Sequence, residues 1–413
     1  MDEIEVPQYF LCPISLQIMK DPVTTVTGIT YDRDSIEKWA KTSSSGATVL
    51  CPVTKQPLPQ ASDMTPNHML RRLIQAWCVS NAKKGIDQIP TPKSPLHRST
   101  VLKLVRDLKN GCNRAIAALK RMEELAGESE RNRKLMAEAG VAKAIFLFIL
   151  ARCSGDVGST EGLDRALRVL QLTWTPSAEN VRVLEEIYPN NFVNSVLWIL
   201  NSRQDCAGKT LALSILKKFT EVMAGSVHLE RLEPSFFAGI VKVLRGGVSP
   251  AAARSALKIL VAAAAAGRNR AKIVEAGAVV ELVEMELAGP ADKRTTELVF
   301  CLLAQLCSCA DGRQQLLGHA GSVALAAKRL LRVSPAADDR ILCVVDAVAR
   351  FAAAPEVVAE MMRVGGVTKL CMVLQADCSA HLKKKAREIL RLHSSVWSNS
   401  PCIQVYLLTW HAR

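Results

Sequence analysis

Two short segments near the start of the chain contain the residues with the clearest chemical potential. Residues 12–15 (CPIS) and residues 51–54 (CPVT) have the C-x-x-C spacing of a zinc knuckle, but a hydroxyl residue replaces the second cysteine in each. The Cys and His residues among residues 1–80 are Cys12, Cys51, His68 and Cys78. Because two of them fall near opposite ends of one predicted helix, they do not complete a paired four-ligand site. The sequence therefore predicts two loops that hold no metal, and no cofactor is expected.

Hydrogen bonds are expected to hold the two loops together in place of a metal. Polar side chains that can bond to backbone groups flank both loops. They are Ser15, Asp21, Tyr31, Asp32, Arg33 and Thr54. A buried polar group without a partner costs about 1–3 kcal/mol, so such a network has to be complete.

A hairpin and a helix are predicted between the two loops. Residues 23–30, with a central glycine, suit two short strands and a turn. Asp32 is placed to cap a helix over residues 33–40, in which Ile36 and Trp39 are neighbours at i, i+3. These elements would set the second loop beside the first.

A second helix is predicted after the second loop, with Asn67 as its N-cap. Its apolar residues share one face. They are Leu70, Leu73, Ile74 and Trp77, of which the first three are expected to be core residues. Residues 1–80 are thus predicted to form a small α+β unit.

The rest of the chain repeats itself. Residues 81–98 contain three prolines and no helical period, which predicts a linker. Beyond the linker, similar segments return with their glycines in the same phase, 137, 44 and 44 residues apart. These glycines are Gly140, Gly277, Gly321 and Gly365. Two degenerate units, starting near residues 180 and 228, fill the longest interval, so about six units are expected.

Each unit is predicted to consist of a short helix, a glycine with positive φ, and two longer amphipathic helices. In one third helix, an apolar stripe follows the spacing i, i+3, i+4 and i+8. The stripe consists of Leu298, Cys301, Leu302 and Leu306. Since one unit cannot bury such a stripe alone, residues 99–395 are predicted to stack into an all-α solenoid, followed by a tail over residues 396–413.

Charge and cysteine content narrow the class of protein. The net charge is +14, yet residues 1–80 hold seven basic and eight acidic residues, so the remainder carries about +15. Thirteen scattered cysteines and an acidic N-terminus argue against a secreted disulfide scaffold and predict a reducing, cytoplasmic location. The longest apolar runs are too short for a membrane-spanning helix.

Four ordered blocks resemble the U-box. Residues 10–23, 28–39, 51–58 and 66–77 match its motifs F-x-C-P-I-[ST], G-x-T-Y-[DE]-R, C-P-V-T and P-N-x-x-L-R almost without departure. Residues 273–287 resemble the armadillo signature. The order of the two parts is that of a plant family of U-box ubiquitin ligases. The fold implied is an α+β, metal-free RING-like U-box followed by an all-α armadillo-repeat solenoid.

The resemblance implies a ligase that forms no covalent intermediate and docks a ubiquitin-conjugating enzyme through its U-box. By the motif positions, Ile14, Trp39 and Pro52 would contact the conjugating enzyme, and Lys55 would contact donor ubiquitin. A protein substrate would bind in the armadillo groove and receive ubiquitin on a lysine. Association of copies through the U-box stays open, and relatives of this kind are linked to plant stress and immune signalling.

Three other functions are weighed against the ligase. An armadillo scaffold or adaptor without ligase activity is the main alternative. A catalytic-cysteine ligase is disfavoured because its candidate thiols sit in or beside apolar helical patterns, where thiols are usually inert. These are Cys112, Cys206, Cys301, Cys307, Cys309, Cys343 and Cys371. Nucleic-acid binding is not expected, because the basic run over residues 383–387 is typical of a solvated helix face. The positive charge of the repeats would instead favour acidic substrates or an acidic membrane surface.

Overall fold

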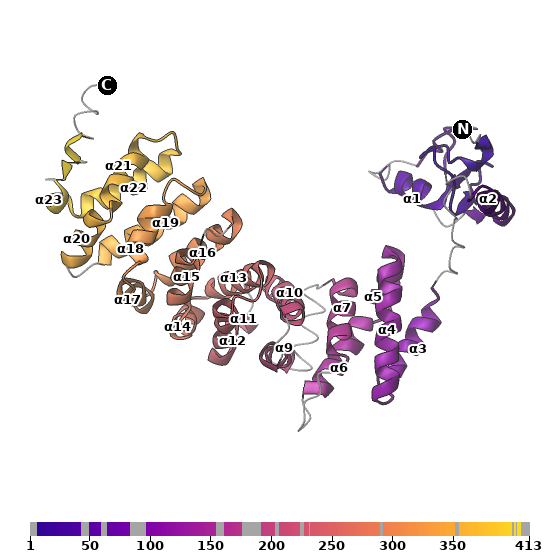
Figure 1. Cartoon of the computed structure of the whole chain (residues 1–413), viewed down its shortest axis with the longest axis horizontal. Helices are drawn as coiled ribbons and strands as arrows, with labels where there is room; N and C mark the ends of the chain where they lie inside the picture. The colour runs from indigo at the N-terminus through magenta and orange to yellow at the C-terminus, as the bar shows by residue number, and fades with distance from the viewer. Residues whose placement is uncertain are drawn as a thin grey trace. The chain divides into compact units, whose positions relative to one another are not determined.

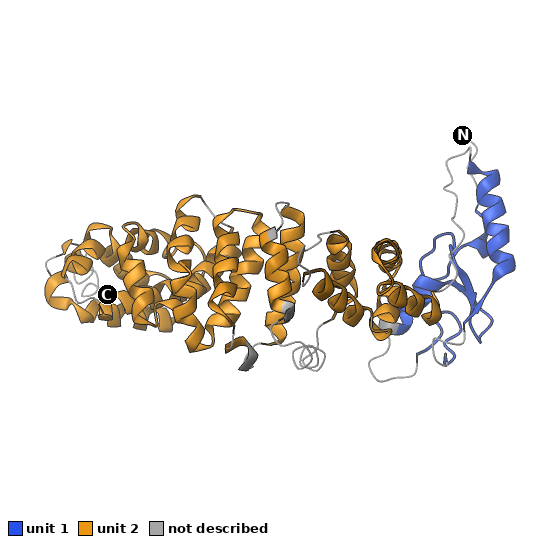
Figure 2. Ribbon diagram, turned by 90° about the horizontal axis from the view of Figure 1, so that it is seen from below, with its two compact units in different colours: residues 1–95 blue, residues 96–413 orange. Residues whose placement is uncertain are grey.

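The fold is described from a computed structural model, in two compact units. Residues 1–95 form the N-terminal unit and residues 96–413 the C-terminal unit (Figure 2). The structure describes residues 6–42, 49–58, 64–82, 96–153, 161–175, 191–202, 206–223, 227–230, 232–289, 292–351, 355–398, 400–401 and 403–405.

The N-terminal unit combines a small sheet with two helices, as expected for an α+β fold. Its elements are η1 (Gln8–Phe10), β1 (Pro22–Thr24), β2 (Thr30–Asp32), α1 (Arg33–Thr42), β3 (Thr65–Pro66) and α2 (His68–Ser80). The strands are antiparallel in the order β2-β1-β3, with Val23 opposite both Tyr31 and Pro66. The predicted hairpin is confirmed, and Gly28 in its turn has a φ of +79°.

The two helices of this unit confirm the predicted N-cap Asn67 and differ from the prediction at Asp32 and Leu73. Asn67 caps α2, since its side chain accepts a bond from the Leu70 amide at 3.0 Å. Asp32 precedes α1 as expected, but its Oδ1 accepts bonds from the amides of residues 20 and 21 at 2.8 and 2.9 Å. Leu73 is not a core residue, because 54% of it is exposed, whereas Ile74 is 1% exposed.

The C-terminal unit is a row of helices, which Figure 1 shows from α3 to α23. The first are α3 (Arg98–Asp107), α4 (Cys112–Glu128), α5 (Glu130–Glu138), α6 (Val141–Cys153), α7 (Leu163–Thr173), α9 (Asn191–Ser202), α10 (Cys206–Val222) and α11 (Val227–Glu230). They are followed by α12 (Pro234–Arg245), α13 (Pro250–Ala264), α14 (Gly267–Glu275), α15 (Ala278–Leu287), α16 (Lys293–Leu306) and α17 (Ala310–Gly318). The last are α18 (Ser322–Arg329), α19 (Pro335–Phe351), α20 (Pro355–Arg363), α21 (Gly366–Gln375), α22 (Ala380–Leu392) and α23 (Ser394–Trp397).

These helices recur as a short helix, a second helix and a long third helix. Successive third helices pack on one another, so α4, α7, α10, α13, α16, α19 and α22 form one layer, here called the ladder helices. Several ladder helices begin at a side-chain cap, for example Ser249 before α13 and Asp292 before α16. Part of the degenerate unit expected from residue 180 lies outside the described residues, and α9 is its described helix.

The phase-matched glycines do not all have the predicted conformation. Gly140, Gly277 and Gly365 have φ values of +77°, +82° and +77°. Gly321 instead has a φ of −88°. A Cβ atom there would lie 3.0 Å from Leu287 Cδ1, so close packing rather than a left-handed turn favours glycine at this position.

The hydrophobic core of the C-terminal unit differs from the sequence expectation at two places. In α16, Leu302 and Leu306 are fully buried, but Leu298 and Cys301 are only half-buried and face a groove described below. At the C-terminal end, Trp397 is fully buried, so the core reaches into the segment assigned to a tail. Residues 406–413 lie outside the described residues.

The length and apolar content of the helices decide whether any of them could span a membrane. Within the described ranges, no helix is both long enough and apolar enough to cross a bilayer.

Candidate functional site

The two cysteine loops have the same backbone hydrogen-bond pattern. In the first loop, the Cys12 amide donates to the Gln17 carbonyl at 2.9 Å, and the Leu16 amide donates to the Cys12 carbonyl at 2.8 Å. In the second loop, the corresponding bonds are Cys51 to Gln56 at 2.8 Å and Lys55 to Cys51 at 3.0 Å. Leu16 and Lys55 occupy equivalent places, and both have positive φ, at +55° and +58°.

Strand β2 holds both loops by their sulfur atoms. The Asp32 amide donates to Cys12 Sγ at 3.3 Å, and the Tyr31 hydroxyl lies 3.0 Å from Cys51 Sγ. Tyr31 and both cysteines are fully buried. Two successive residues of one strand therefore tie both loops to the start of α1.

Hydrogen bonds also set the acidity of the two thiols. Burial raises the pKa of Cys51, but bonds from Thr27, Thr54 and Tyr31 outweigh it and lower the pKa to about 6. At Cys12, burial is likewise outweighed by bonds from Ser15 and from the Asp32 and Ile14 amides, and the pKa is lowered. Ser15 and Thr54 occupy the positions at which a zinc knuckle has its second cysteine. Here their hydroxyls form hydrogen bonds with the first cysteine of the same loop, Cys12 or Cys51.

The sulfur atoms are therefore engaged as hydrogen-bond acceptors within the unit. Cys78 is buried in the core of the unit, and burial raises the pKa of its thiol. No group of three or more His, Cys, Asp or Glu side chains able to hold a metal ion occurs among the described residues.

An ion-pair network joins the first loop to both helices. Asp21 pairs with Arg33 at 2.7 Å and with Arg71 at 3.4 Å. The structure thus brings Asp21, Asp32 and Arg33 together, as the sequence analysis grouped them. Arg71 was missed, and its place in the fourth block, four residues after the Asn67 cap, was the available signal.

Trp39 lies beside the second loop, and Ile14 and Pro52 lie in the loops themselves. Trp39 is 37% exposed, and its indole N–H donates to the Leu50 carbonyl at 3.0 Å, which ties α1 to the second loop. Ile14 and Pro52 are half-buried, and Ile14 packs on the core of the unit. Lys55 is exposed.

Apolar side chains in or beside the two loops, which the sequence analysis did not single out, are also exposed. Leu16 is 75% exposed, Val53 is 52% exposed and Leu50 is 44% exposed. Their positions in or beside the two loops could have identified them, since exposed apolar residues gathered on a small unit are typical of interaction sites.

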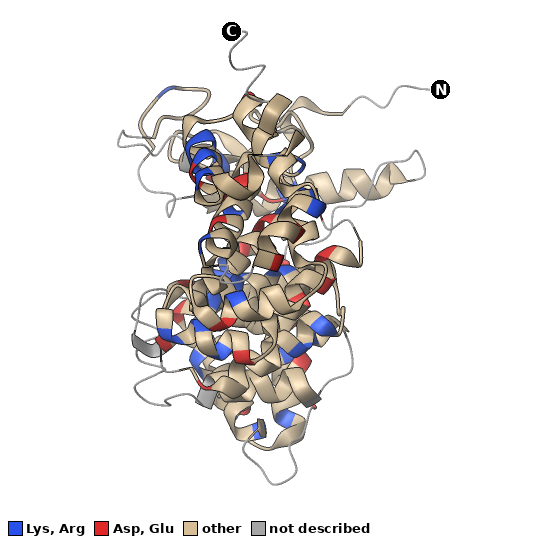
Figure 3. Cartoon of the chain, turned by 90° about the vertical axis from the view of Figure 1, so that its left-hand side faces the viewer, with Lys and Arg blue, Asp and Glu red and all other residues tan. Residues whose placement is uncertain are grey.

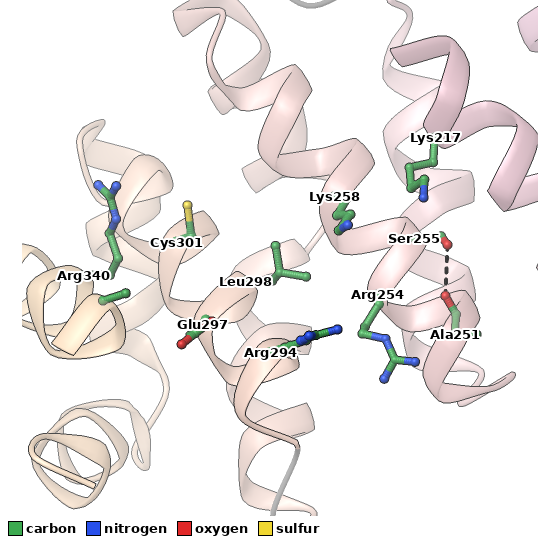
Figure 4. Close-up of a pocket in the computed structure, with 11 residues that line it drawn as sticks. Lys217, Ala251, Arg254, Ser255, Lys258, Arg294, Glu297, Leu298, Cys301 and Arg340 are labelled. Carbon is green, nitrogen blue, oxygen red and sulfur yellow. Dashed lines mark hydrogen bonds between the residues drawn. The ribbon is translucent and has the colours of Figure 1, made fainter. Parts of the chain in front are cut away.

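A second candidate site is a groove on the ladder helices. It has a volume of about 580 Å³ and is lined from α10, α13, α16 and α19 (Figure 4). The residues that line it are Lys217, Ala251, Arg254, Ser255, Lys258, Arg294, Glu297, Leu298, Cys301, Ala336 and Arg340. The half-buried Leu298 and Cys301 thus line this surface, and Leu298 also packs against the core.

Comparisons with known proteins settle the family. A family model described as U-box domain matches residues 6–83, and one described as plant U-box protein ARM repeat region matches residues 100–412. The chain belongs to the plant U-box protein family. Its N-terminal unit is the U-box, and its C-terminal unit is the armadillo (ARM) repeat region.

Relatives of this U-box protein are named as ligases. It is 41% identical over 449 residues to E3 ubiquitin-protein ligase PUB24 of Arabidopsis thaliana, covering 99% of this chain and 96% of that protein. It is also 41% identical over 404 residues to E3 ubiquitin-protein ligase PUB23 of the same plant, covering 97% and 96%. Among solved structures, an engineered protein covers 72% of this chain and 68% of its own, at 19% identity and a TM-score of 0.49. The U-box protein is therefore an E3 ubiquitin transferase rather than a scaffold alone.

The thiols of the armadillo repeat region are less uniformly buried than expected. Cys112 and Cys206 are exposed, whereas Cys307 and Cys371 are buried. Cys112 Sγ lies 2.8 Å from an Arg152 nitrogen. All twelve cysteines of the described segments are free thiols.

Proposed function

We propose that the U-box docks a ubiquitin-conjugating enzyme through Ile14, Trp39 and Pro52. The observation that carries this proposal is the hydrogen bond of Trp39 to Leu50, which holds a partly exposed aromatic ring in one orientation beside the second loop. Aromatic residues fixed at the centre of an apolar surface are typical binding hot spots. The Asp21 network and the two sulfur-centred bonds keep this surface in shape.

The chemistry takes place on the docked conjugating enzyme and not on the U-box. A substrate lysine attacks the thioester carbonyl of ubiquitin, an isopeptide bond forms, and the cysteine of the conjugating enzyme leaves. The U-box contributes by holding thioester and lysine in a reactive orientation. Lys55, exposed next to the docking surface, is proposed to donate a hydrogen bond to ubiquitin.

The armadillo repeat region is proposed to capture the substrate in the groove of its ladder helices. The whole reaction is proposed to take place in the cytoplasm, since a reducing compartment maintains free thiols. The first of these proposals is supported by the division of the chain into a compact U-box and a separate helical unit.

The test is discharge of ubiquitin from a charged conjugating enzyme to free lysine. Trp39→Ala and Ile14→Ala should each slow the discharge by about tenfold or more, because a hot-spot truncation costs about 2 kcal/mol. Val79→Ala is the matched control, since Val79 is 61% exposed on α2 and lies outside the two loops. Discharge at the wild-type rate by both loop-side variants, with unchanged circular dichroism, would show that docking takes place elsewhere.

A further inference from the structure

The groove of the ladder helices is strongly basic. Five cationic side chains line it, but Glu297 is the one acidic residue among the described residues that do so. The cations come from four successive ladder helices (Figure 4). They are Lys217, Arg254, Lys258, Arg294 and Arg340.

Most of this positive charge is not neutralised inside the protein. Arg254 pairs with Asp292 at 2.8 Å, a residue that also caps α16. No ion pair to Lys217, Lys258, Arg294 or Arg340 occurs within the described part of the chain. The Glu297 carboxylate accepts a bond from the Ser334 hydroxyl at 2.6 Å. The groove therefore has a surplus of cations that face solvent.

Acidic and basic residues lie together elsewhere on the chain, so the surplus of cations distinguishes the groove. Figure 3 shows acidic and basic residues both spread over the ribbon, so the net charge of the chain alone does not mark a site. On α22, for instance, Lys385 is paired with Asp339 at 2.7 Å and also lies 3.0 Å from Cys343 Sγ. That lysine belongs to the basic run considered above, and its charge is used within the fold.

The dimensions of the groove suit an extended peptide. Packed helices lie about 8–10 Å apart, so four successive ladder helices span about 24–30 Å. An extended chain advances about 3.3 Å per residue, which gives a segment of about eight residues. Leu298 and Cys301, on the central helix α16, offer a small apolar patch between the flanking cations.

We propose that this groove selects substrates that present an extended acidic segment of about eight residues with an apolar side chain near its middle. The inference rests on the proposed function of the groove as the place of substrate capture, and it adds the chemical class of the substrate. Carboxylates or phosphoserines supply the negative charge. An aromatic side chain is absent from the described lining residues, which disfavours single-stranded nucleic acid, since its bases need stacking platforms.

The experiment measures anisotropy of a fluorescent eight-residue peptide, rich in Asp and Glu with one central Leu, bound to the full chain. Arg294→Glu combined with Lys258→Glu should weaken binding by at least about tenfold. Raising salt from about 50 mM to about 300 mM should weaken wild-type binding several-fold, because exposed charges are screened. Lys328→Glu is the matched control, since Lys328 is exposed on α18, outside the groove, and should leave binding unchanged.

Four further arms decide the outcome. A peptide with Gln in place of every acid should not bind, and equal binding of the Gln peptide would overturn the proposal. A phosphoserine peptide of equal charge that binds more tightly than the Asp/Glu peptide would assign the charge to phosphate within the same proposal. An oligonucleotide or anionic lipid vesicle that binds more tightly than either peptide, through the same two cations, would also overturn it.

The proposed function is tested separately in the same preparations. Discharge of ubiquitin to free lysine should be unchanged in the Arg294→Glu, Lys258→Glu double variant, because the variant leaves the U-box intact. If discharge fails in the wild type while the peptide binds, the ligase mechanism fails and the groove proposal stands. Loss of peptide binding together with a lowered melting temperature calls for Arg294→Gln and Arg340→Gln, where wild-type affinity would overturn the proposal.

Discussion

Two adjacent residues of β2 hold the two cysteine loops, which belong to the proposed docking surface. Tyr31 reaches Cys51 with its hydroxyl, and Asp32 reaches Cys12 with its backbone amide. The carboxylate of Asp32 accepts hydrogen bonds from the backbone amides of residues 20 and 21, just before β1. Loss of one of these bonds would loosen a whole loop.

Replacing Tyr31 by Phe should test this arrangement. The change leaves Cys51 Sγ without one of its donors and should destabilise the U-box by about 1–3 kcal/mol. Hydrogen exchange of backbone amides in the segment 49–58 measures the loss. Tyr9→Phe is the control, since Tyr9 is 65% exposed, and similar exchange in both variants would contradict a structural role for the Tyr31 hydroxyl.

Residue types could be predicted better than their partners. Polar residues around the loops were identified because their side chains can bond to backbone. The partner of Asp32 could not be identified, since a cap is a local pattern, whereas its observed bonds join residues 11 and 12 positions apart. The contact roles of Ile14, Trp39, Pro52 and Lys55 stay predictions, because exposure alone does not show what binds.

Hydrophobic periodicity predicted correctly that these segments are helices. It was less accurate about which face of each helix is buried. In α2, Leu70, Ile74 and Trp77 follow i, i+4, i+7, and Leu73 lies about 65° from the centre of that face. In α16 the buried face is centred near Val299, with Leu302 and Leu303 on either side of it. A four-residue stripe does not define the centre of a helix face to better than about one quarter turn.

The repeat glycines give a prediction for the element scale. Gly277→Ala should cost about 1–2 kcal/mol, since its φ of +82° is left-handed. Gly321→Ala should cost less, because its φ is ordinary and the Leu287 side chain, 45% exposed, can turn away from the new Cβ. Urea unfolding followed by circular dichroism measures both, and equal costs would contradict this distinction.

The ladder helices make the armadillo repeat region a one-dimensional stack, in which each repeat contacts mainly its neighbours. Its family could be predicted from sequence, because four glycines return in phase. The residues that line the groove could not be predicted, because they come from four helices far apart in the sequence.

A cavity in one ladder helix should therefore act locally. Leu302→Ala, at a fully buried site, should cost about 2–5 kcal/mol and raise hydrogen exchange in α13, α16 and α19. Exchange in the U-box should be unchanged, because the two units are separate. Leu298→Ala, at the half-buried groove position, is the control with a smaller effect, and a rise in U-box exchange would show that the units unfold together.

The matched backbones of the two cysteine loops bear on how a partner recognises the U-box. A partner that read only the backbone would meet two similar loops and could bind in two opposite orientations. The equivalent left-handed positions present Leu16 in one loop and Lys55 in the other, one apolar and one cationic. The other differences, Ile14 against Val53 and Ser15 against Thr54, are conservative, so this pair is what would give the proposed docking surface a direction.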